Sequence, residues 1–574
     1  MLGRLLKSLR AAGASASAGG GAAERNEAGL AAWQRGDLAA AEREFRAALA
    51  ADPGFAPAYG NLGMVVWDQR RLDEGLAILR RGVEIDRAHV GIRINLANAL
   101  VIGNQHAQAI EHYAEVLRRR PGHPQATANL LKPLLDTCRW DEAERLVGGL
   151  VERWRAAPDD AVLDAITPFN TLLVELPQAM RLDVARRYAG RVAARAASLQ
   201  QVVRAPRPAG GRLRIGYASA DFHDHATLHL MAGLFEAHDR DRFEIHAYSW
   251  GIDDASAYRA RVRAAIEHFH DVRGLGHDAL AQRIADDGID ILVDLKGYTG
   301  ESRAEVFALR PAPVQVNYLG YPGTMGAPFI DWMIADAVVV PADTEGTYAE
   351  RVARLPGCYQ ANDRLQPIAG RASTRAQWRL PQDAVVFACF NKHHKIERAT
   401  FAAWMRILAA VPHAVLWLLG GHGKEALRGA AQAAGIDPTR IVFADKAPKP
   451  EHVERHRVAD LFLDTRTYNA HTTASDALWG GLPLLTWPTD AFAGRVAGSL
   501  LHAVGLPELV VADGEAYERT AVELARDPQR MAALRAKLAA NRLATPLFDT
   551  AGFTRGLEEA YAALAPASGT LARK

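Results

Sequence analysis

The first quarter of the chain carries a 34-residue pattern of small and large apolar positions. Small residues recur in one column at Ala41, Gly75, Ala109 and Ala143, and large apolar residues recur in another at Phe45, Leu79, Tyr113 and Val147. A small side chain lets two helices approach closely and a large one fills the seam between them, as in tetratricopeptide repeats. We therefore predict tetratricopeptide repeats over residues 24–155, stacked into an α-helical superhelix with a concave surface.

Asn61, Asn95 and Asn129 lie one repeat apart, each followed by Leu, at the same position of the first helix in successive repeats. A side-chain amide has both a donor and an acceptor, so such a ladder could hold a peptide backbone without reading its sequence. Alternatively, each amide bonds a neighbouring helix end or only solvates the groove, and the chemistry alone favours neither reading. The ladder makes a protein or peptide a candidate partner of the repeat groove.

After a predicted helical connector over 156–205 and a Pro- and Gly-rich boundary at 204–211, short apolar runs alternate with amphipathic stretches. The runs are Leu213–Ala218, Ile289–Leu295, Val314–Leu319, Val385–Phe390, Ala414–Leu419, Ile441–Phe443 and Leu461–Leu463. Such runs between helices indicate parallel sheets covered on both faces. Because the series restarts after the loop around 359–374, we predict two Rossmann-like domains, 211–365 and 370–574, facing each other across a ligand-binding cleft.

Composition narrows the function classes. A chain of 574 residues is too long for one core, and its 68 Lys and Arg against 66 Asp and Glu give no bulk electrostatic case for binding nucleic acid. The three scattered cysteines suit a reducing compartment, so we expect a cytoplasmic protein. No run reaches the roughly 20 apolar residues of a membrane span. The basic and then Gly-, Ala- and Ser-rich residues 1–23 are typical of a flexible tail.

The strongest local site follows the strand that ends at Asp464. His471, Thr472 and Thr473 open a helix after a short loop, and free backbone N–H groups at a helix start bind anions. Two hydroxyls and an imidazole add donors that suit a diphosphate, and Asp476, one turn later, could accept from ribose hydroxyls. The alternative is an ordinary N-cap formed by one of the threonines, but the three residues together exceed what a cap needs.

Two further groups lie on loops of the second domain. Ala447, Lys449, His452 and Arg455 surround the start of a helix, where stems and rings could pack on a flat base, although surface residues there need no function. The run Asn391-Lys392-His393-His394-Lys395 follows a buried strand, so it should lie on the cleft rim. A cation at this place could neutralise a departing phosphate. A solvated basic loop is the alternative.

In the first domain, the segment from Asp221 to Thr227 directly follows the first strand, where catalytic groups collect in open α/β sheets. His223, His225 and His229 lie there with carboxylates nearby, but their spacing fits no standard zinc pattern. We therefore expect no metal site at this segment.

Four motifs carry a resemblance to a known family: Phe307-Ala-Leu-Arg-Pro-Ala-Pro313, Leu319-Gly-Tyr-Pro-Gly-Thr324, Ala447-Pro-Lys449, and the string from Asn469 to Asp476. With these, the chain from about residue 24 to its C-terminal helices resembles the O-GlcNAc transferase (SPINDLY-like) family, nearer its bacterial members. The resemblance implies a GT-B fold and an inverting glycosyltransferase. It would move N-acetylglucosamine from UDP-GlcNAc to Ser or Thr hydroxyls of proteins, without an essential metal or another cofactor.

The resemblance also implies roles for single residues. His471, Thr472 and Thr473 would hold the diphosphate of the donor, and Asp476 would hold its ribose. The uracil would be framed by Ala447, Lys449, His452 and Arg455. The residues near the sugar would be Thr227, Leu319 and Gly320. Lys395 would stabilise the UDP leaving group. His225 matches a histidine discussed as the catalytic base, and Asp221 matches a carboxylate also proposed for that role, which removes the proton of the attacking hydroxyl.

The chain departs from the family pattern at two of these places. Ala226 follows His225 where Pro is usual, and Lys392 stands where Gln or Asn is usual, which adds a positive charge beside the phosphates. The alternatives are another donor, UDP-glucose or GDP-fucose, Asn side chains as acceptors, or a repeat-protein adaptor that binds nucleotide without turnover. His471 and His452 favour a UDP-sugar, because the GDP-fucose-using SPINDLY branch lacks a histidine at the position of His471.

Overall fold

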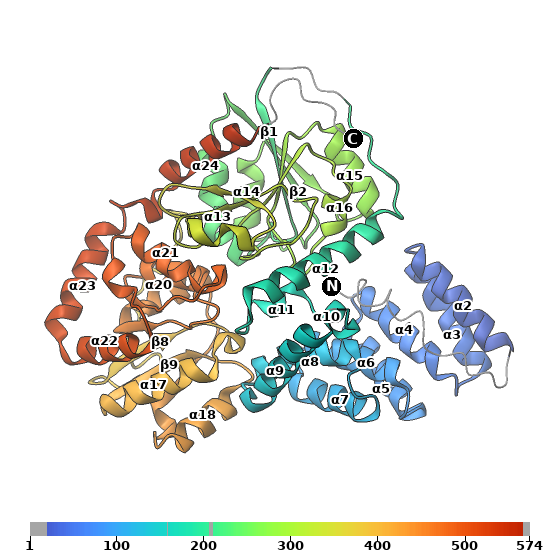
Figure 1. Ribbon diagram of the computed structural model, residues 1–574, viewed down its shortest axis with the longest axis horizontal. Helices are drawn as coiled ribbons and strands as arrows, with labels where there is room; N and C mark the ends of the chain where they lie inside the picture. The colour runs from blue at the N-terminus through green and yellow to red at the C-terminus, as the bar shows by residue number, and fades with distance from the viewer. Residues whose placement is uncertain (1–19, 158, 206–209, 566–574) are drawn as a thin grey trace. The chain divides into compact units, whose positions relative to one another are not determined.

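The computed structural model of the chain describes residues 20–157, 159–205 and 210–565. They form two compact units that divide between Ile166 and Thr167. The first unit is helical and is drawn in blue shades in Figure 1, whereas the second contains two β-sheets with their covering helices.

The first unit is a series of antiparallel helix pairs, as the repeat pattern predicts. Its helices are α2 (Gly20–Gln34), α3 (Leu38–Ala51), α4 (Ala56–Asp68), α5 (Leu72–Ile85), α6 (Val90–Ile102), α7 (His106–Arg119), α8 (Pro124–Asp136), α9 (Trp140–Ala156) and α10 (Ala161–Ala165). The column of small residues has a steric cause. A Cβ added at Gly75 would lie 2.9 Å from the carbonyl oxygen of Gly63, so α4 and α5 meet backbone to backbone.

The column of large residues fills the seams between these helices. Phe45, Leu79 and Tyr113 are fully buried, whereas Val147 in the last pair is only half-buried. Helix α2 begins at Gly20, four residues before the predicted start of the repeats, and residues 1–19 of the predicted tail lie outside the described residues. The predicted connector is not one element, because α10 belongs to the first unit and the helices after residue 166 to the second.

The second unit contains two sheets, and every strand pairing in them is parallel. The seven-stranded sheet has the order β3-β2-β1-β4-β5-β6-β7 and the five-stranded sheet the order β10-β9-β8-β11-β12. The strands are β1 (Leu213–Ser219), β2 (Phe243–Ser249), β3 (His268–Asp271), β4 (Ile291–Asp294), β5 (Val314–Asn317), β6 (Trp332–Ala335), β7 (Arg351–Arg354), β8 (Val385–Cys389), β9 (Ala414–Leu419), β10 (Ile441–Ala444), β11 (Leu461–Leu463) and β12 (Leu484–Leu485). All seven apolar runs of the sequence become strands, which confirms the predicted pair of parallel-sheet domains.

The helices of the second unit lie before, between and after these strands. They are α11 (Pro168–Thr171), α12 (Gln178–Ala196), α13 (Ala226–Ala237), α14 (Ala257–Ala265), α15 (His277–Asp286), α16 (Ala304–Ala308), α17 (Arg398–Ala410), α18 (Lys424–Ala433), α19 (Lys449–Glu454), α20 (Thr472–Trp479), α21 (Val496–Ala503), α22 (Gly514–Arg526), α23 (Pro528–Asn541) and α24 (Thr550–Leu564). Short 3-10 turns lie at Ala342–Thr347, His393–Lys395, Pro438–Arg440, Arg455–Val458, Phe492–Gly494, Pro507–Leu509 and Pro546–Phe548.

The last helix, α24, packs on α13 of the first sheet rather than on the second sheet. His238 and Glu558 form the joint: both are buried, and the imidazole Nδ1 lies 2.9 Å from the carboxylate. Assigning all of 370–574 to the second domain is therefore wrong for this helix. The sequence pattern of this segment predicts an amphipathic helix but does not indicate which element the helix packs against.

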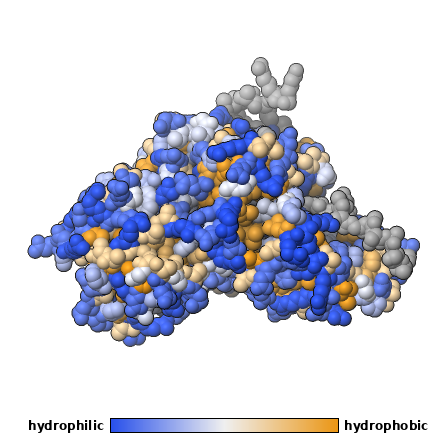
Figure 2. All heavy atoms as spheres, turned by 60° about the horizontal axis from the view of Figure 1, so that its bottom comes forward, coloured by the Kyte–Doolittle hydropathy of each residue, from blue (hydrophilic) through white to orange (hydrophobic). Residues whose placement is uncertain are grey.

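The surface of the described residues is mostly hydrophilic on the face shown in Figure 2, with smaller hydrophobic areas between the hydrophilic ones. Among the described residues, no helix is both long enough and apolar enough to cross a membrane.

Candidate active site

Helix α20 presents its N-terminus as predicted. Its N-cap is His471, which makes no side-chain capping hydrogen bond, and its first residues are Thr472 and Thr473. The His471 Nε2–H donates to the carbonyl of Ala493 over 3.0 Å, and the ring stacks on Tyr468 with centroids 4.6 Å apart. Burial, and next the charge of Lys395, lower the pKa of His471 well below its ordinary value. The threonines therefore do not serve as the N-cap, and a helix N-terminus of this kind can bind an anion.

Lys395 lies beside this helix start. Its Nζ donates to the carbonyl oxygen of Asn469 over 2.8 Å and lies 4.0 Å from the centre of the Tyr468 ring. Burial lowers the pKa of the Lys395 ammonium, and the nearby carboxylate of Asp464 opposes this effect. An anion that binds beside a buried lysine stabilises its charged ammonium form, because the anion compensates for the water that burial removed.

Asp464 organises the loop that holds both groups, and the sequence reasoning gave it no role. It is 1 % exposed and accepts hydrogen bonds from the backbone N–H groups of Thr465 (2.8 Å) and Ala470 (2.7 Å) and from the hydroxyl of Thr486 (2.8 Å). Its position at the carboxyl end of a buried strand is the sequence feature that could have indicated a role, because functional side chains gather at such strand ends.

Asn391 links the same loop to helix α20. Its amide donates to the Thr465 hydroxyl over 2.8 Å, and its carbonyl oxygen accepts from the Thr473 hydroxyl over 2.6 Å. The next residue, Lys392, has an exposed side chain. Asn391 and Lys395 thus place the segment 391–395 against the loop before α20 and the start of that helix.

The residues expected around a base form a second cluster. Lys449 makes an ion pair with Asp476, and His452 Nε2 lies 3.6 Å from the other oxygen of that carboxylate. Arg455 is fully buried behind them, where it donates to the Asp445 carbonyl over 2.7 Å and contacts His452 Nδ1. Arg455 therefore orients His452 from behind, while Ala447 lies two residues before the start of α19.

On the first sheet, Asp221 follows β1 and meets Lys296, which follows β4. The ammonium group donates to both carboxylate oxygens, over 2.8 and 2.9 Å, and both side chains are buried. Because β1 and β4 are parallel neighbours, their carboxyl ends lie side by side and bring these residues together. The same strand-end rule applies to Lys296, which follows the predicted strand Ile289–Leu295, but the sequence alone did not single out this residue.

His225 contacts Asp221 from the start of α13. Its Nδ1 lies 3.5 Å from the Asp221 carboxylate and accepts a hydrogen bond from the backbone N–H of Thr227 over 3.2 Å. A neutral ring with an acceptor at Nδ1 carries its proton at Nε2, so the outward nitrogen is a donor. Burial lowers the pKa of His225 to about 4, an effect that Asp221 opposes and Lys296 adds to.

The predicted sugar-binding turn lies next to these groups. Leu319 has a left-handed backbone (φ 64°), and a Cβ on Gly320 would lie only 1.9 Å from the carbonyl oxygen of Leu295. The turn therefore packs directly against the end of β4, one residue before Lys296. Only glycine fits at position 320 without moving one of these backbones.

The two sheets present their groups toward each other. Lys449 and Asp476 of the second sheet both act on the pKa of His229 in α13, which burial and then Lys449 lower. Gln360, between the sheets, donates to the Ser475 hydroxyl of α20 over 2.7 Å. Lys449 and Asp476 therefore lie near α13, and helix α20 contacts the segment that joins the two sheets.

The three histidines of the first domain do not converge on one point. His223, His225 and His229 face different carboxylates, Asp254 at 3.9 Å, Asp221 at 3.5 Å and Asp224 at 2.6 Å. This arrangement offers no shared coordination centre there.

The asparagine ladder of the repeats bonds largely to other asparagines. Asn61 donates to Asn26 over 2.8 Å and Asn129 donates to Asn98 over 3.0 Å, each across about one repeat. Asn95 is buried, and its Oδ1 has no hydrogen-bond partner among the described residues. Two of the three amides thus tie successive repeats together through their N–H groups.

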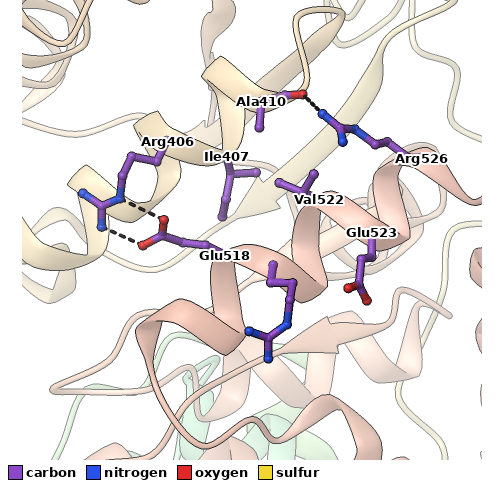
Figure 3. A pocket seen from close by; sticks show the side chains of 8 residues that line it. Arg406, Ile407, Ala410, Glu518, Val522, Glu523 and Arg526 are labelled. Atoms are coloured by element: carbon purple, nitrogen blue, oxygen red, sulfur yellow. Dashed lines mark hydrogen bonds and ion pairs between the residues drawn. The ribbon is translucent and has the colours of Figure 1, made fainter.

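A surface groove of about 310 Å³ lies elsewhere, between α17 and α22. Figure 3 shows its floor of Ile407 and Val522 and its rim, where Arg406 donates to Glu518 over 2.8 and 2.6 Å. It contains none of the predicted site residues and takes no part in the chemistry developed below.

Comparison with known proteins agrees with this geometry. Residues 137–370 and 366–557 match glycosyl transferase family 41, and residues 32–91 match a tetratricopeptide repeat. The chain belongs to glycosyl transferase family 41. A solved structure of a mutant O-GlcNAc transferase from Thermobaculum terrenum is similar to this family member with a TM-score of 0.66 and 29% identity, over 94% of this chain and 96% of that one.

Curated relatives of this family member come from plants and animals. A probable UDP-N-acetylglucosamine–peptide N-acetylglucosaminyltransferase, SEC, of Arabidopsis thaliana is 38% identical over 449 residues, 75% of this chain and 46% of the relative. A UDP-N-acetylglucosamine–peptide N-acetylglucosaminyltransferase of Caenorhabditis elegans is 31% identical over 74% of this chain and 47% of the relative. The chain thus spans about half the length of these relatives.

Proposed function

We propose that this family 41 member is an inverting glycosyltransferase that transfers N-acetylglucosamine from UDP-N-acetylglucosamine to Ser or Thr hydroxyls of proteins. The observation that carries the proposal is the start of α20, which has no side-chain cap, with the Lys395 ammonium beside it. A diphosphate fits a helix N-terminus that a cation flanks. Relatives that transfer this sugar to peptides support the choice of donor and acceptor.

The donor lies, in this proposal, along the second sheet. Thr472, Thr473 and His471 bind the diphosphate, and Lys395 neutralises the charge that develops on departing UDP. The carboxylate of Asp476 accepts from the ribose hydroxyls. Lys449 and His452 frame the uracil beside Ala447, Arg455 holds His452 in place, and Lys392 adds a positive charge at the rim.

The sugar and the acceptor hydroxyl meet at the first sheet. Thr227, Leu319 and Gly320 line the sugar, with Asp221 and His225 next to them. In the arrangement described above, the outward Nε2 of His225 is a donor, and Lys296 neutralises Asp221. His225 can therefore remove the proton of the acceptor hydroxyl only after its ring gives up the hydrogen bond from the Thr227 N–H. The proposed role of His225 as a base includes this rearrangement.

The acceptor protein binds, in this proposal, to the concave surface of the repeats, with Asn61, Asn95 and Asn129 contacting its backbone. The three cysteines are free and buried, which suits a cytoplasmic enzyme. Transfer to such an acceptor needs no metal ion in this mechanism, because Lys395 and the helix N-terminus supply the positive charge at the diphosphate.

The test is transfer of labelled sugar from UDP-N-acetylglucosamine into proteins of a lysate of the source cells. Discrete labelled bands are expected with the wild type and with Lys446→Ala, an exposed lysine of the same domain, but not with Lys395→Ala. Labelling only from UDP-glucose or only from GDP-fucose would identify that sugar nucleotide as the donor in place of UDP-N-acetylglucosamine. The absence of labelling from all three, together with tight UDP binding, would favour a repeat-protein adaptor instead.

A further inference from the structure

Three histidines and two carboxylates gather on one face of the first sheet, away from the residues of the proposed transfer. Strands β2 and β3 are parallel neighbours with His246 opposite His268 and Tyr248 opposite His270. Side chains alternate between the faces of a strand, so Glu244 and His246 share a face with His268 and His270. The pattern Glu-x-His on β2 beside His-x-His on β3 therefore places potential metal ligands together across the strand pair.

The distances within this group suit one small cation. The Glu244 Oε1 atom lies 3.1 Å from His246 Nε2 and 3.3 Å from His268 Nε2. The three ligand atoms all lie within 4.8 Å of one another. Zinc binds nitrogen and oxygen at about 2.0–2.2 Å in a tetrahedron, which puts neighbouring ligand atoms about 3.4 Å apart. The observed spacings match that requirement with little movement.

The surroundings hold these ligands in place and leave one side open. Arg214 donates to the other carboxylate oxygen of Glu244 over 3.1 Å and so leaves Oε1 facing the two histidines. His246 is buried, and His270 lies 3.4 Å from its second ring nitrogen. The His268 side chain is 40% exposed, so a fourth ligand can come from solvent.

A neighbouring set, His246, His270 and Asp287, is less suited to a cation. Asp287 already accepts from the Tyr248 hydroxyl over 2.8 Å and from Arg283 over 2.9 Å. The same guanidinium contacts His270 Nδ1 at 3.3 Å, so Arg283 touches two of the three potential ligands. In the Glu244 set, Arg214 and Arg212 contact only Oε2 of Glu244 and leave Oε1 to the histidines. The Glu244 set is therefore the better centre.

We propose that Glu244, His246 and His268 bind a Zn²⁺ ion that ties the edge strand β3 to β2. Two imidazoles and one carboxylate are a known ligand set of zinc, with water completing the tetrahedron. β3 is a four-residue edge strand, so a metal link to β2 stabilises one edge of this sheet. The site contributes to stability and has no part in the proposed sugar transfer.

Zinc binding is measured on the untagged full chain by competition of ZnCl₂ with a chromogenic chelator. One zinc equivalent is expected for the wild type and for His413→Ala, an exposed histidine outside the site. His268→Ala and Glu244→Gln should weaken this equivalent about tenfold or more, since loss even of an outer-shell partner has that effect. The melting temperature should rise with zinc in the wild type and in His413→Ala, but not in the two site variants.

A wild type without a zinc equivalent overturns the proposal, and so does an equivalent that both site variants retain. X-ray absorption at the zinc edge of the wild-type protein provides a measurement that depends on no variant. Two imidazole nitrogens with oxygen ligands at about 2.0–2.2 Å support the site, whereas a sulfur ligand or a six-oxygen shell excludes it.

Discussion

The Lys395→Ala substitution tests the proposed chemistry at its most specific point. The Lys395 Nζ lies at the start of α20, bonded to the Asn469 carbonyl at 2.8 Å. Because burial lowers the pKa of this ammonium, the free enzyme gains little from its charge. In the proposed reaction UDP gains one further negative charge as it departs, and this added charge favours the ammonium form of Lys395. Its contribution therefore falls mainly on the transition state.

The expected loss follows from this placement. Removing one positioned donor for a developing anion lowers kcat by about 10²–10³, or roughly 2.7–4 kcal/mol. KM for the donor should change less than kcat, since Thr472, Thr473 and the helix N-terminus remain. The melting temperature should shift by only a few degrees, because the lost hydrogen bond, about 1 kcal/mol, is offset by removing a buried cation.

The assay is the initial rate of UDP release with an acceptor protein identified by labelling, together with UDP affinity from calorimetry. Lys446→Ala serves as the matched control. A kcat within tenfold of the wild type would refute the leaving-group role of Lys395. A loss of UDP affinity as large as the loss of kcat would instead assign Lys395 to ground-state binding.

Three further substitutions test the rest of the proposed site. Lys296→Met removes a charge that lowers the pKa of His225, so this pKa should rise and the acidic limb of kcat/KM should move to higher pH. An unchanged profile measured from about pH 3.5 to 8 would contradict this expectation. Gly320→Ala should destabilise the fold by about 1–3 kcal/mol in denaturant unfolding and reduce turnover, whereas Gly300→Ala, which has open space around it, should do neither. Asn95→Ala combined with Asn129→Ala should weaken a protein acceptor more than UDP, and equal losses of both affinities would exclude the ladder role.

The site was only partly visible in the sequence. His471 to Thr473 could be placed at a helix start because a buried strand and a short loop precede them. Lys296 and Asp464 were missed, since their partners are distant: Lys296 pairs with Asp221 across 75 residues, and Asp464 gathers donors from its loop and from Thr486. Arg455 contacts Asp445 and His452 in the interior of the domain. These contacts depend on the burial of Arg455, which no local sequence pattern predicts.

Local periodicity determined the helix pairs of the repeats and seven of the twelve strands of the described residues. The 34-residue repeat predicted the helix pairs, and seven apolar runs predicted seven strands, because these patterns follow from backbone geometry within one segment. Only the tertiary structure decided which segments meet. The register of parallel strands joined Asp221 to Lys296 and His246 to His268, and α24 packed on α13 although it follows the second sheet. Such pairings depend on the packing of surfaces that are remote in the chain, and so each segment's own sequence does not specify them.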